Sequence, residues 1–370
     1  MRSSPDVKTT SEVVSAKPGP ETTSEVVFTT APRATALGAF LEGWRRALAA
    51  PAITLGVLAA LFLMALPLGL ALRGMLVEHL GPSVVAERAA WGWEAGWAAE
   101  FAAQAQGLGR TFTHEILGFG GTLSIIGGFF DAKPLPPVVA GAAAAYAVLW
   151  IFLSGGILDR FARARPVRTA AFFASCGVFF WRFLRLGVMV GAAYWALFAW
   201  LHPFLFGTLW NSWTAGMTTE REAMAVRAGL YLVFALALAL VSLIADYAKV
   251  RAVVEDRRSM ISALGASMRF LRRRPFRVFG LYLLSALASI VVVRVWFTAA
   301  PSAWASVPVA FLLTQVYLLF RVWAKLAWMA GEVVFFQGEL AHATYTAAPL
   351  QMWPDSPAAE AIENLVSRTR

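Results

Sequence analysis

The stretch AGLYLVFALALALVSLIA, residues 228–245, contains no charged side chain. Crossing the hydrocarbon core of a bilayer takes about 20 residues of α-helix, and in lipid only a helix or a closed barrel satisfies its own backbone hydrogen bonds. The stretch lacks the alternation of barrel strands, so it predicts a transmembrane helix. Further uncharged runs occupy residues 47–72, 134–158, 186–219 and 295–320. The sequence therefore predicts an all-α, polytopic membrane helical bundle.

Composition supports the same class of protein. Of the 370 residues, 59% are hydrophobic and 15% are charged, which is too apolar for an ordinary soluble domain. The net charge is +10, but the arginines lie beside apolar runs, where anionic lipid explains them better than nucleic acid does. The single cysteine, Cys176, excludes an intrachain disulfide and a cysteine-based metal cluster. We expect membrane lipids and other membrane proteins as partners, with no nucleic acid, metal or cofactor.

Six predicted spans divide the chain. We place them at about 47–72, 134–158, 183–206, 226–248, 276–298 and 302–328. Residues 1–35, rich in Ser, Thr and Pro, predict a disordered tail; residues 36–345 form the transmembrane domain, and 346–370 a polar C-terminal tail. Residues 36–49 predict an amphipathic helix at the membrane surface. The last span is expected to continue as helix past the bilayer towards Glu339.

The segment between the first two spans, residues 73–133, is too polar to cross as a whole and predicts a helical insert outside the bilayer. Trp93, Trp97 and Phe101 recur every four residues, which predicts an aromatic stripe that anchors a helix at the membrane interface or, as the alternative, lines a groove for a lipid tail. Residues 117–130 are apolar and glycine-rich but too short to span, so they are either re-entrant or interfacial.

Charge in the loops predicts the orientation of the chain. The segment from Lys249 to Arg277 carries nine basic and two acidic residues, whereas 73–133 carries four basic and six acidic. Basic loops are retained in the cytoplasm, so both termini and the basic loops are expected there. Arginine greatly outnumbers lysine and alanine is abundant, which is typical of a GC-rich bacterial genome. The predicted location is therefore a bacterial inner membrane.

Two basic loops resemble each other, and we name them the first elbow (residues 159–182) and the second elbow (residues 249–274). Asp159 ends the second span and precedes RFARAR; Asp246 ends the fourth span and precedes YAKVR. With a five-residue length difference, the aligned positions are Ser175 with Ser267, Arg182 with Arg274, and Arg185 with Arg277. The pattern predicts a parallel tandem repeat of two span–elbow–span units, each with a short amphipathic helix. The alternative is that the charge rule alone placed these arginines.

The second elbow carries the clearest amphipathic pattern. Met260, Leu264, Met268 and Leu271 recur at steps of three and four and predict one apolar stripe along a helix. Basic residues gather at the C-terminal end of this stripe, where they also suit the helix dipole. They are Arg269, Arg272, Arg273 and Arg274. Such a helix is expected to lie in the inner interface and to bind anionic lipid.

These residues also carry a family resemblance. The pattern of Asp246, Arg251, Val254-Glu255-Asp256 and Ser267-Met268-Arg269-Phe270 resembles six-span bacterial membrane proteins of unknown function. Over residues 134–345 the chain is similar to the membrane domain attached to some glycerophosphodiester phosphodiesterases. The catalytic barrel of those enzymes has no counterpart in this sequence, so the resemblance does not imply their hydrolytic activity. It implies a scaffold or lipid-associated role.

Carboxylates at the inner ends of two spans are the first candidate sites. Asp159 and Asp246 are expected to pair with Arg163 and Arg251 respectively, and so to fix the geometry of the elbows. The alternative is a functional carboxylate, because a charge within a span is costly and often functional.

Two further polar side chains interrupt apolar runs. Arg294 is expected near the outer interface, where its long side chain can reach the headgroups. The alternative is that it binds an anion or pairs with a carboxylate of 73–133. Gln315 is the lone amide near the middle of the sixth span, and its expected role is a hydrogen bond to another helix.

The sequence contains no recognisable catalytic or metal motif, so it does not select one function. We consider three function classes. His114-Glu115 begins like a zinc-protease motif, but the second histidine is missing. A non-enzymatic scaffold, assembly factor or accessory subunit is the favoured class. A carrier or channel would place a cavity at mid-depth beside Gln315. A lipid-modifying enzyme with its site in 73–133 would bring His114 and a carboxylate such as Glu100 to one pocket.

Overall fold

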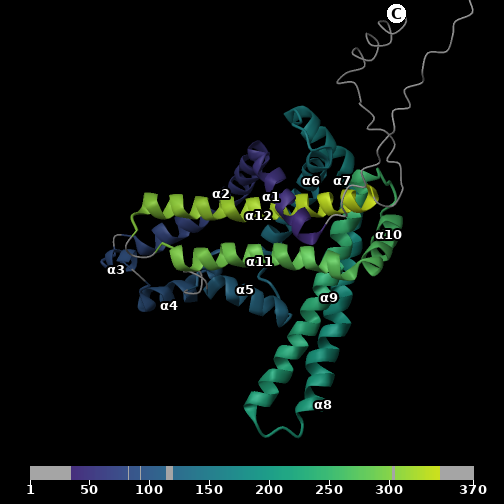
Figure 1. Cartoon of the computed structure of the whole chain (residues 1–370). Helices are drawn as coiled ribbons and strands as arrows, with labels where there is room; N and C mark the ends of the chain where they lie inside the picture. The colour runs from purple at the N-terminus through teal and green to yellow at the C-terminus, as the bar shows by residue number, and fades with distance from the viewer. Residues whose placement is uncertain (1–34, 82, 92, 114–119, 302–304, 342–370) are drawn as a thin grey trace, which may run out of the picture. The chain divides into compact units, whose positions relative to one another are not determined.

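The computed structural model describes residues 35–81, 83–91, 93–113, 120–301 and 305–341. Every regular element in these segments is helical, and six helices are long and apolar enough to cross a membrane (Figure 1). The all-α fold class and the six predicted spans are therefore confirmed, and the chain is a multi-pass membrane protein. The predicted N-terminal and C-terminal tails lie outside the described residues.

The spans are longer than predicted. They are α2 (Pro51–Leu80), α6 (Pro137–Arg163), the run Thr169–Thr214, α9 (Glu220–Val254), α11 (Pro275–Ala299) and α12 (Val307–Ala341). The run consists of α7 (Thr169–Ala196), the π-helical turns η3 (Leu197–Leu201) and η4 (Phe204–Leu209), and α8 (Trp210–Thr214). Proline begins α2, α6 and α11, because the first turn of a helix does not need the missing N–H. The last span continues as helix through Glu339, as predicted.

Short helices complete the chain. They are α1 (Ala36–Leu48), α3 (Val85–Trp91), α4 (Ala95–Gln104), the 3-10 turn η1 (Gly109–Thr111), α5 (Gly120–Phe130) and α10 (Met260–Arg273). The predicted helical insert between the first two spans therefore contains α3, α4, η1 and α5. On α4, Trp97 and Phe101 stack with ring centroids 5.5 Å apart, whereas Trp93 precedes the helix and stacks on Phe112 instead.

The two elbows differ in their helices. The predicted separate amphipathic helix of the first elbow is wrong, because α7 begins at Thr169 and continues without a break into the third span. In the second elbow α10 is separate, as predicted. Pro275 explains the break at Arg274, since proline lacks an N–H and its ring disfavours a helical conformation in the residue before it.

The helix α1 packs into the bundle instead of lying only on the membrane surface. Ala39, Gly43 and Ala47 recur every four residues and are buried where α1 contacts α12. A Cβ atom on Gly43 would lie 2.6 Å from the backbone nitrogen of Gly331, so a larger residue could not occupy this position without a shift of one helix. Small residues allow this close backbone approach between membrane helices.

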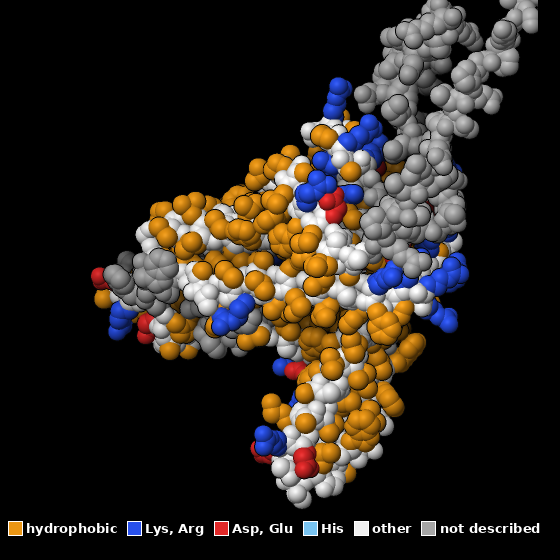
Figure 2. All heavy atoms as spheres, viewed as in Figure 1, with side chains coloured by type: hydrophobic (Ala, Val, Ile, Leu, Met, Phe, Trp, Pro, Cys, Tyr) orange, Lys and Arg blue, Asp and Glu red, His pale blue; other side chains and the backbone are white. Residues whose placement is uncertain are grey.

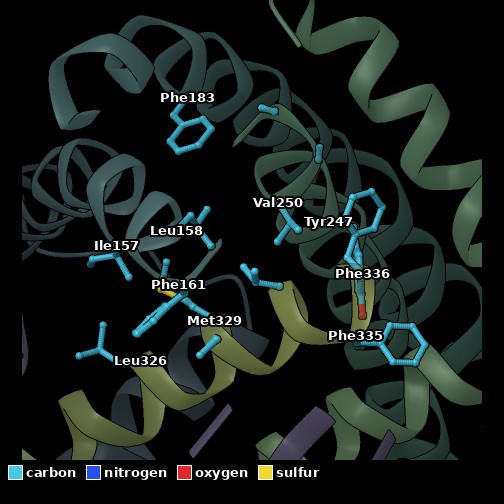
Figure 3. Packing of buried hydrophobic residues seen from close by; sticks show 14 of the residues in the cluster. Ile157, Leu158, Phe161, Phe183, Tyr247, Val250, Leu326, Met329, Phe335 and Phe336 are labelled. Atoms are coloured by element: carbon cyan, nitrogen blue, oxygen red, sulfur yellow. The ribbon is translucent and has the colours of Figure 1, made fainter. Parts of the chain in front are cut away.

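The core of the protein lies where α6, α9, α10 and α12 meet, near the elbows. Phe161 of α6 is fully buried, with Leu326 and Met329 of α12 around it (Figure 3). Tyr247 of α9 packs on Phe270 of α10 with ring centroids 5.3 Å apart. The large side chains of α2, by contrast, are mostly exposed. The elbow end is thus held by protein packing, while α2 presents an apolar surface suited to lipid.

Candidate functional site

The first elbow is built around Asp159, in the last turn of α6. Its Oδ1 atom lies 2.9 Å from the Nε of Arg163, so the predicted pair is present. Its Oδ2 atom accepts a hydrogen bond of 2.9 Å from the hydroxyl of Ser175 on α7. Close approach of α7 depends on Gly156, where a Cβ atom would lie 2.7 Å from the Sγ of Cys176. Asp159 therefore acts as a structural link between two spans.

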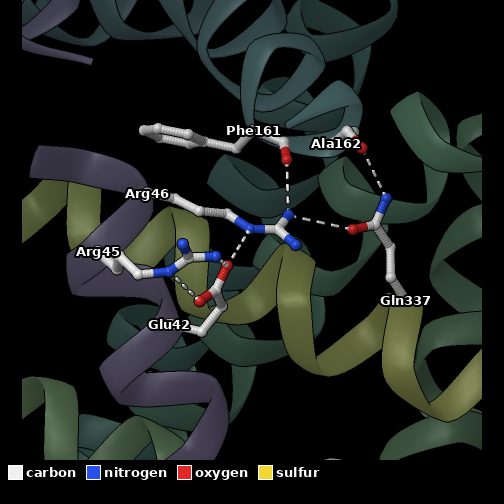
Figure 4. A network of polar contacts seen from close by, with 6 residues as sticks. All are labelled: Glu42, Arg45, Arg46, Phe161, Ala162 and Gln337. Carbon is white, nitrogen blue, oxygen red and sulfur yellow. Dashed lines mark hydrogen bonds and ion pairs between the residues drawn. The ribbon is translucent and has the colours of Figure 1, made fainter. Parts of the chain in front are cut away.

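The C-terminal end of α6 is also held from outside the elbow (Figure 4). A helix leaves its last carbonyl groups without partners. Here Arg46 of α1 donates to the carbonyl of Phe161 at 2.8 Å, and Gln337 of α12 donates to that of Ala162 at 2.9 Å. The same Arg46 lies 3.0 Å from a carboxylate oxygen of Glu42. Two chain segments far apart in the sequence thus complete this helix end.

Glu42 is charged in this network. Its carboxylate accepts hydrogen bonds from Arg45 and Arg46 (Figure 4). The bond from Arg45 is the main cause of a pKa below the ordinary value for glutamate, and partial burial opposes it. A depressed pKa stabilises the fold above the ordinary pKa of about 4.3 and loses that contribution as pH falls through the lower value.

The second elbow has a different set of ion pairs. Asp246 lies 2.5 Å from Lys249, and Arg251 lies 2.9 Å from Glu255. The predicted Asp246–Arg251 pair is therefore wrong. Positions three or four apart share a helix face, but positions five apart do not, so each residue pairs with its neighbour on its own face.

A buried acidic residue of α12 lies beside the Asp246–Lys249 pair, and the sequence analysis did not identify it as a candidate site residue. Glu332 is 4% exposed and accepts a hydrogen bond of 2.9 Å from the indole N–H of Trp328. Its carboxylate interacts electrostatically with Asp246 and Lys249. The sequence did carry a signal: Lys325, Glu332 and Glu339 recur every seven residues in a largely apolar helix, which places them on one helix face.

The other two members of this series also contact other helices. Glu339 is 2% exposed, and its two oxygen atoms lie 2.5 Å from Arg274 and 3.1 Å from Arg277. The ammonium group of Lys325 lies 3.8 Å from the ring centroid of Trp150 on α6, a cation–π contact. The charges of α12 therefore fix this helix against its neighbours.

An ion pair joins the two elbows directly. Arg182 of α7 lies 2.6 Å from Asp256 in the second elbow, and its guanidinium lies 5.2 Å from the ring centroid of Phe179. Arg185, one turn further along α7, is exposed. Of the candidate arginines, Arg163, Arg182, Arg251, Arg274 and Arg277 thus have acidic partners within the protein.

The remaining candidate arginines lie on the outside of α10. Arg269, Arg272 and Arg273 are exposed and form no ion pair with any described residue. Figure 2 shows Lys and Arg side chains gathered around α10 and the adjoining ends of α6 and α7, whereas hydrophobic side chains cover the long helices. Beside these arginines are exposed apolar side chains, with Phe276 as much as 90% exposed. This basic and apolar surface is the candidate site, and we name it the α10 face.

The predicted apolar stripe of α10 is only partly correct. Met260 and Leu271 are buried, but Met268 is 49% exposed. The buried face instead includes Ala263 and Phe270, and it packs against α9. The helix is therefore anchored on protein by one face and presents Met268 together with the arginines on the other.

Arg294 and Gln315 lie outside this cluster. Arg294 is exposed near the C-terminal end of α11, and its guanidinium lies 5.2 Å from the ring centroid of Phe297. Gln315 is half-buried, and its amide forms no hydrogen bond with the described part of the chain. Their proposed roles remain predictions.

The cavities bear on the two alternative functions. A cavity of about 270 Å³ lies between α11 and α12, but it is lined by apolar side chains and Gln315 is not among them. A cavity of about 890 Å³ beside α2 and α4 is lined by His79 and by Glu78, Glu94 and Glu100. His114 lies outside the described residues. Within the described residues, no group of His, Cys, Asp and Glu has the geometry of a metal site.

Comparisons of this chain with family models, curated proteins and solved structures found no match. The resemblance to the membrane domain of glycerophosphodiester phosphodiesterases therefore remains a prediction.

Proposed function

We propose that this protein is a non-enzymatic scaffold, assembly or accessory subunit of the bacterial inner membrane that binds anionic phospholipid through its α10 face. The observation that carries the proposal is the contrast among neighbouring arginines. Arg274 and Arg277 have a buried carboxylate, that of Glu339, as partner. Arg269 and Arg272 are exposed without an acidic partner in the described residues.

The surroundings of these arginines suit a lipid headgroup layer. The α10 helix is amphipathic, with its buried face on α9. Exposed Ile261, Met268 and Phe276 lie on or next to this helix. A surface that combines apolar side chains with arginine is typical of helices in the plane of the membrane interface, where headgroups carry the negative charge.

The charge rule supports the orientation that this role needs. Basic residues are concentrated in the elbows, and the insert between α2 and α6 carries more acidic than basic residues. We infer that the elbows and both termini face the cytoplasm, where anionic lipids are exposed to them.

Native mass spectrometry of the full chain in detergent tests lipid binding. The protein is titrated with phosphatidylglycerol or with phosphatidylcholine, and bound lipids are counted. We expect preference for phosphatidylglycerol, and loss of most of it in R269Q/R272Q/R273Q. Each basic residue near an anionic surface contributes about 1 kcal/mol, so the preference should fall by up to about 100-fold at low salt.

The matched control is R73Q/R88Q/R221Q. It removes three exposed arginines from other helices: Arg73 near the C-terminal end of α2, Arg88 on α3 and Arg221 at the N-terminal end of α9. The control should keep the preference of the wild-type protein. Equal phosphatidylglycerol binding by the α10 variant and the wild type would overturn the proposal, as would an equal loss in the control.

A further inference from the structure

A cavity of about 460 Å³ lies among α5, α7, η3, α9 and α11. Most of its lining is aromatic or aliphatic, and it includes Phe129, Phe130, Phe198 and Leu238. No charged side chain lines it. Concave apolar spaces of this size with a few well-placed polar groups are the usual form of small-molecule sites.

The polar groups of the cavity are hydroxyls. Tyr194 and Ser242 both line it, and their oxygen atoms lie 2.5 Å apart. Tyr282 of α11 adds a third hydroxyl to the lining. A hydroxyl pair joined by one hydrogen bond keeps unused lone pairs, so it can still bind a ligand hydroxyl. The Tyr194–Ser242 pair thus gives an otherwise apolar lining a polar group.

The backbone around the cavity is also unusual. Phe198 belongs to the π-helical turn η3, and π-turns within α-helices are frequent at functional sites. The end of α5 is held at the cavity by contacts across the bundle: Tyr231 donates a hydrogen bond to Asp131, and the ring Nε2 of His202 lies 3.0 Å from the carbonyl oxygen of Phe130. The aromatic wall is therefore fixed in place by polar contacts.

We propose that this cavity binds an uncharged, hydroxyl-bearing amphiphile of the membrane, with its apolar chain along Phe198 and Leu238 and its hydroxyl on Tyr194 and Ser242. A charged headgroup does not fit, because no charged side chain lines the cavity to pair with it. Asp246, which interacts electrostatically with Tyr282, lies 2.5 Å from Lys249.

Photo-crosslinking tests this site. The full chain in phosphatidylcholine nanodiscs is irradiated with a long-chain primary alcohol that carries a diazirine in its chain, and mass spectrometry maps the labelled residues. We expect labels on the residues that line the cavity. Ala239 lines it and Leu240 next to it is 53% exposed. Ala239→Phe should therefore abolish cavity labelling by filling the space, and Leu240→Phe, the matched control, should preserve it.

Competition between the photo-reactive alcohol and unlabelled compounds in the wild-type protein tests the site even if Ala239→Phe fails to fold. The unlabelled alcohol should suppress the labels, and the matching fatty acid should not. Ser242→Ala should weaken competition by about three- to tenfold, the effect of losing a neutral hydrogen bond of about 1 kcal/mol. Equal competition by the fatty acid would overturn the uncharged headgroup. Labels spread over all lipid-facing helices, without competition, would overturn the site.

Labelling of the cavity should not depend on the α10 face. R269Q/R272Q/R273Q should keep the cavity labels, because none of these arginines lines the cavity. Loss of labelling in that variant would contradict the separation of the two sites.

Discussion

The two elbows have linkers of equal length but are held in different ways. The linkers occupy 164–168 and 255–259, and each contains one non-glycine residue with left-handed backbone, Ala164 or Asp256. The length difference assumed in the sequence alignment is therefore not in the linkers. Arg163, the last residue of α6, is the fourth after Asp159, whereas Val254, the last of α9, is the eighth after Asp246. The two aspartates do not occupy equivalent positions.

This shift by one turn changes what each aspartate contacts. Asp159 is close enough to the turn to bond Ser175 of the following helix. Asp246 lies one helical turn further from the end of its helix and pairs with Lys249, beside Glu332 of α12. Ser267, which aligned with Ser175, is fully buried and its hydroxyl has no hydrogen-bond partner in the described structure. Similar sequence around two turns therefore does not guarantee similar bonding.

The end of α12 braces both elbows by different means. Gln337 donates a neutral hydrogen bond to the first elbow, and Glu339 provides a carboxylate for Arg274 of the second elbow and for Arg277 at the start of α11. Loss of one partner from a buried ion pair costs about 3–5 kcal/mol, whereas loss of a neutral hydrogen bond costs about 1 kcal/mol. The second elbow is thus the more dependent on one residue.

Replacement of Glu339 should have the largest effect on stability. We expect Glu339→Ala to lower the free energy of unfolding by about 3 kcal/mol, at the lower end of the range for buried pairs because Arg277 is 45% exposed. Gln337→Ala should cost about 1 kcal/mol. Denaturant unfolding in detergent measures both. An equal loss of unfolding free energy in the two variants would contradict the stronger role of Glu339.

The sole cysteine gives this experiment a local reporter. Cys176 is fully buried in the first elbow, so its reaction with a maleimide reports opening there. Ser267→Cys in a Cys176→Ser background reports on the second elbow. Glu339→Ala should speed reaction at position 267 more than at Cys176.

Close packing of the first elbow should have the next largest effect. Gly156→Ala is expected to cost about 2 kcal/mol, because its Cβ would lie 2.8 Å from the carbonyl oxygen of Phe172 and overpacking costs about 1–3 kcal/mol. Gly141→Ala on the same helix meets open space and should be neutral or stabilising by up to about 1 kcal/mol. Thermal unfolding of the two variants compares them; equal melting temperatures would contradict the close contact.

The aligned serines should show the smallest difference. Ser175→Ala removes a hydrogen bond to a carboxylate and should cost about 1.5 kcal/mol. Ser267→Ala removes a buried hydroxyl without a partner and should be neutral or slightly stabilising. The unfolding free energy of each variant is compared with that of the wild type. Equal destabilisation by the two substitutions would show that the two serines have equivalent roles.

The sequence predicts the spans because length and lack of charge are local properties. It places the fifth span within one residue of α11 at each end, and it places the fourth span inside the longer α9. It predicts the separate helix before Pro275 correctly but wrongly predicts a matching break in α7, where Phe183 occupies the aligned position. Helix ends at an elbow depend on single residues, which a span-length pattern does not resolve.

The candidate site is predictable in part. The Asp159–Arg163 pair follows from spacing on one helix. The bonds of Glu339 with Arg274 and of Arg182 with Asp256 join distant segments, and their existence depends on how the helices pack. The cavity beside Tyr194 and Ser242 depends on the packing of several helices and leaves no local pattern.

The order of synthesis gives the end of α12 a second consequence. Translation makes this helix after both of the turns that it holds. Until then the carbonyl of Ala162 lacks its partner Gln337, and Arg274 lacks its partner Glu339. The end of α12 therefore completes the packing of turns that are already made, and we expect a nascent chain stopped before Gln337 to lack both of these contacts.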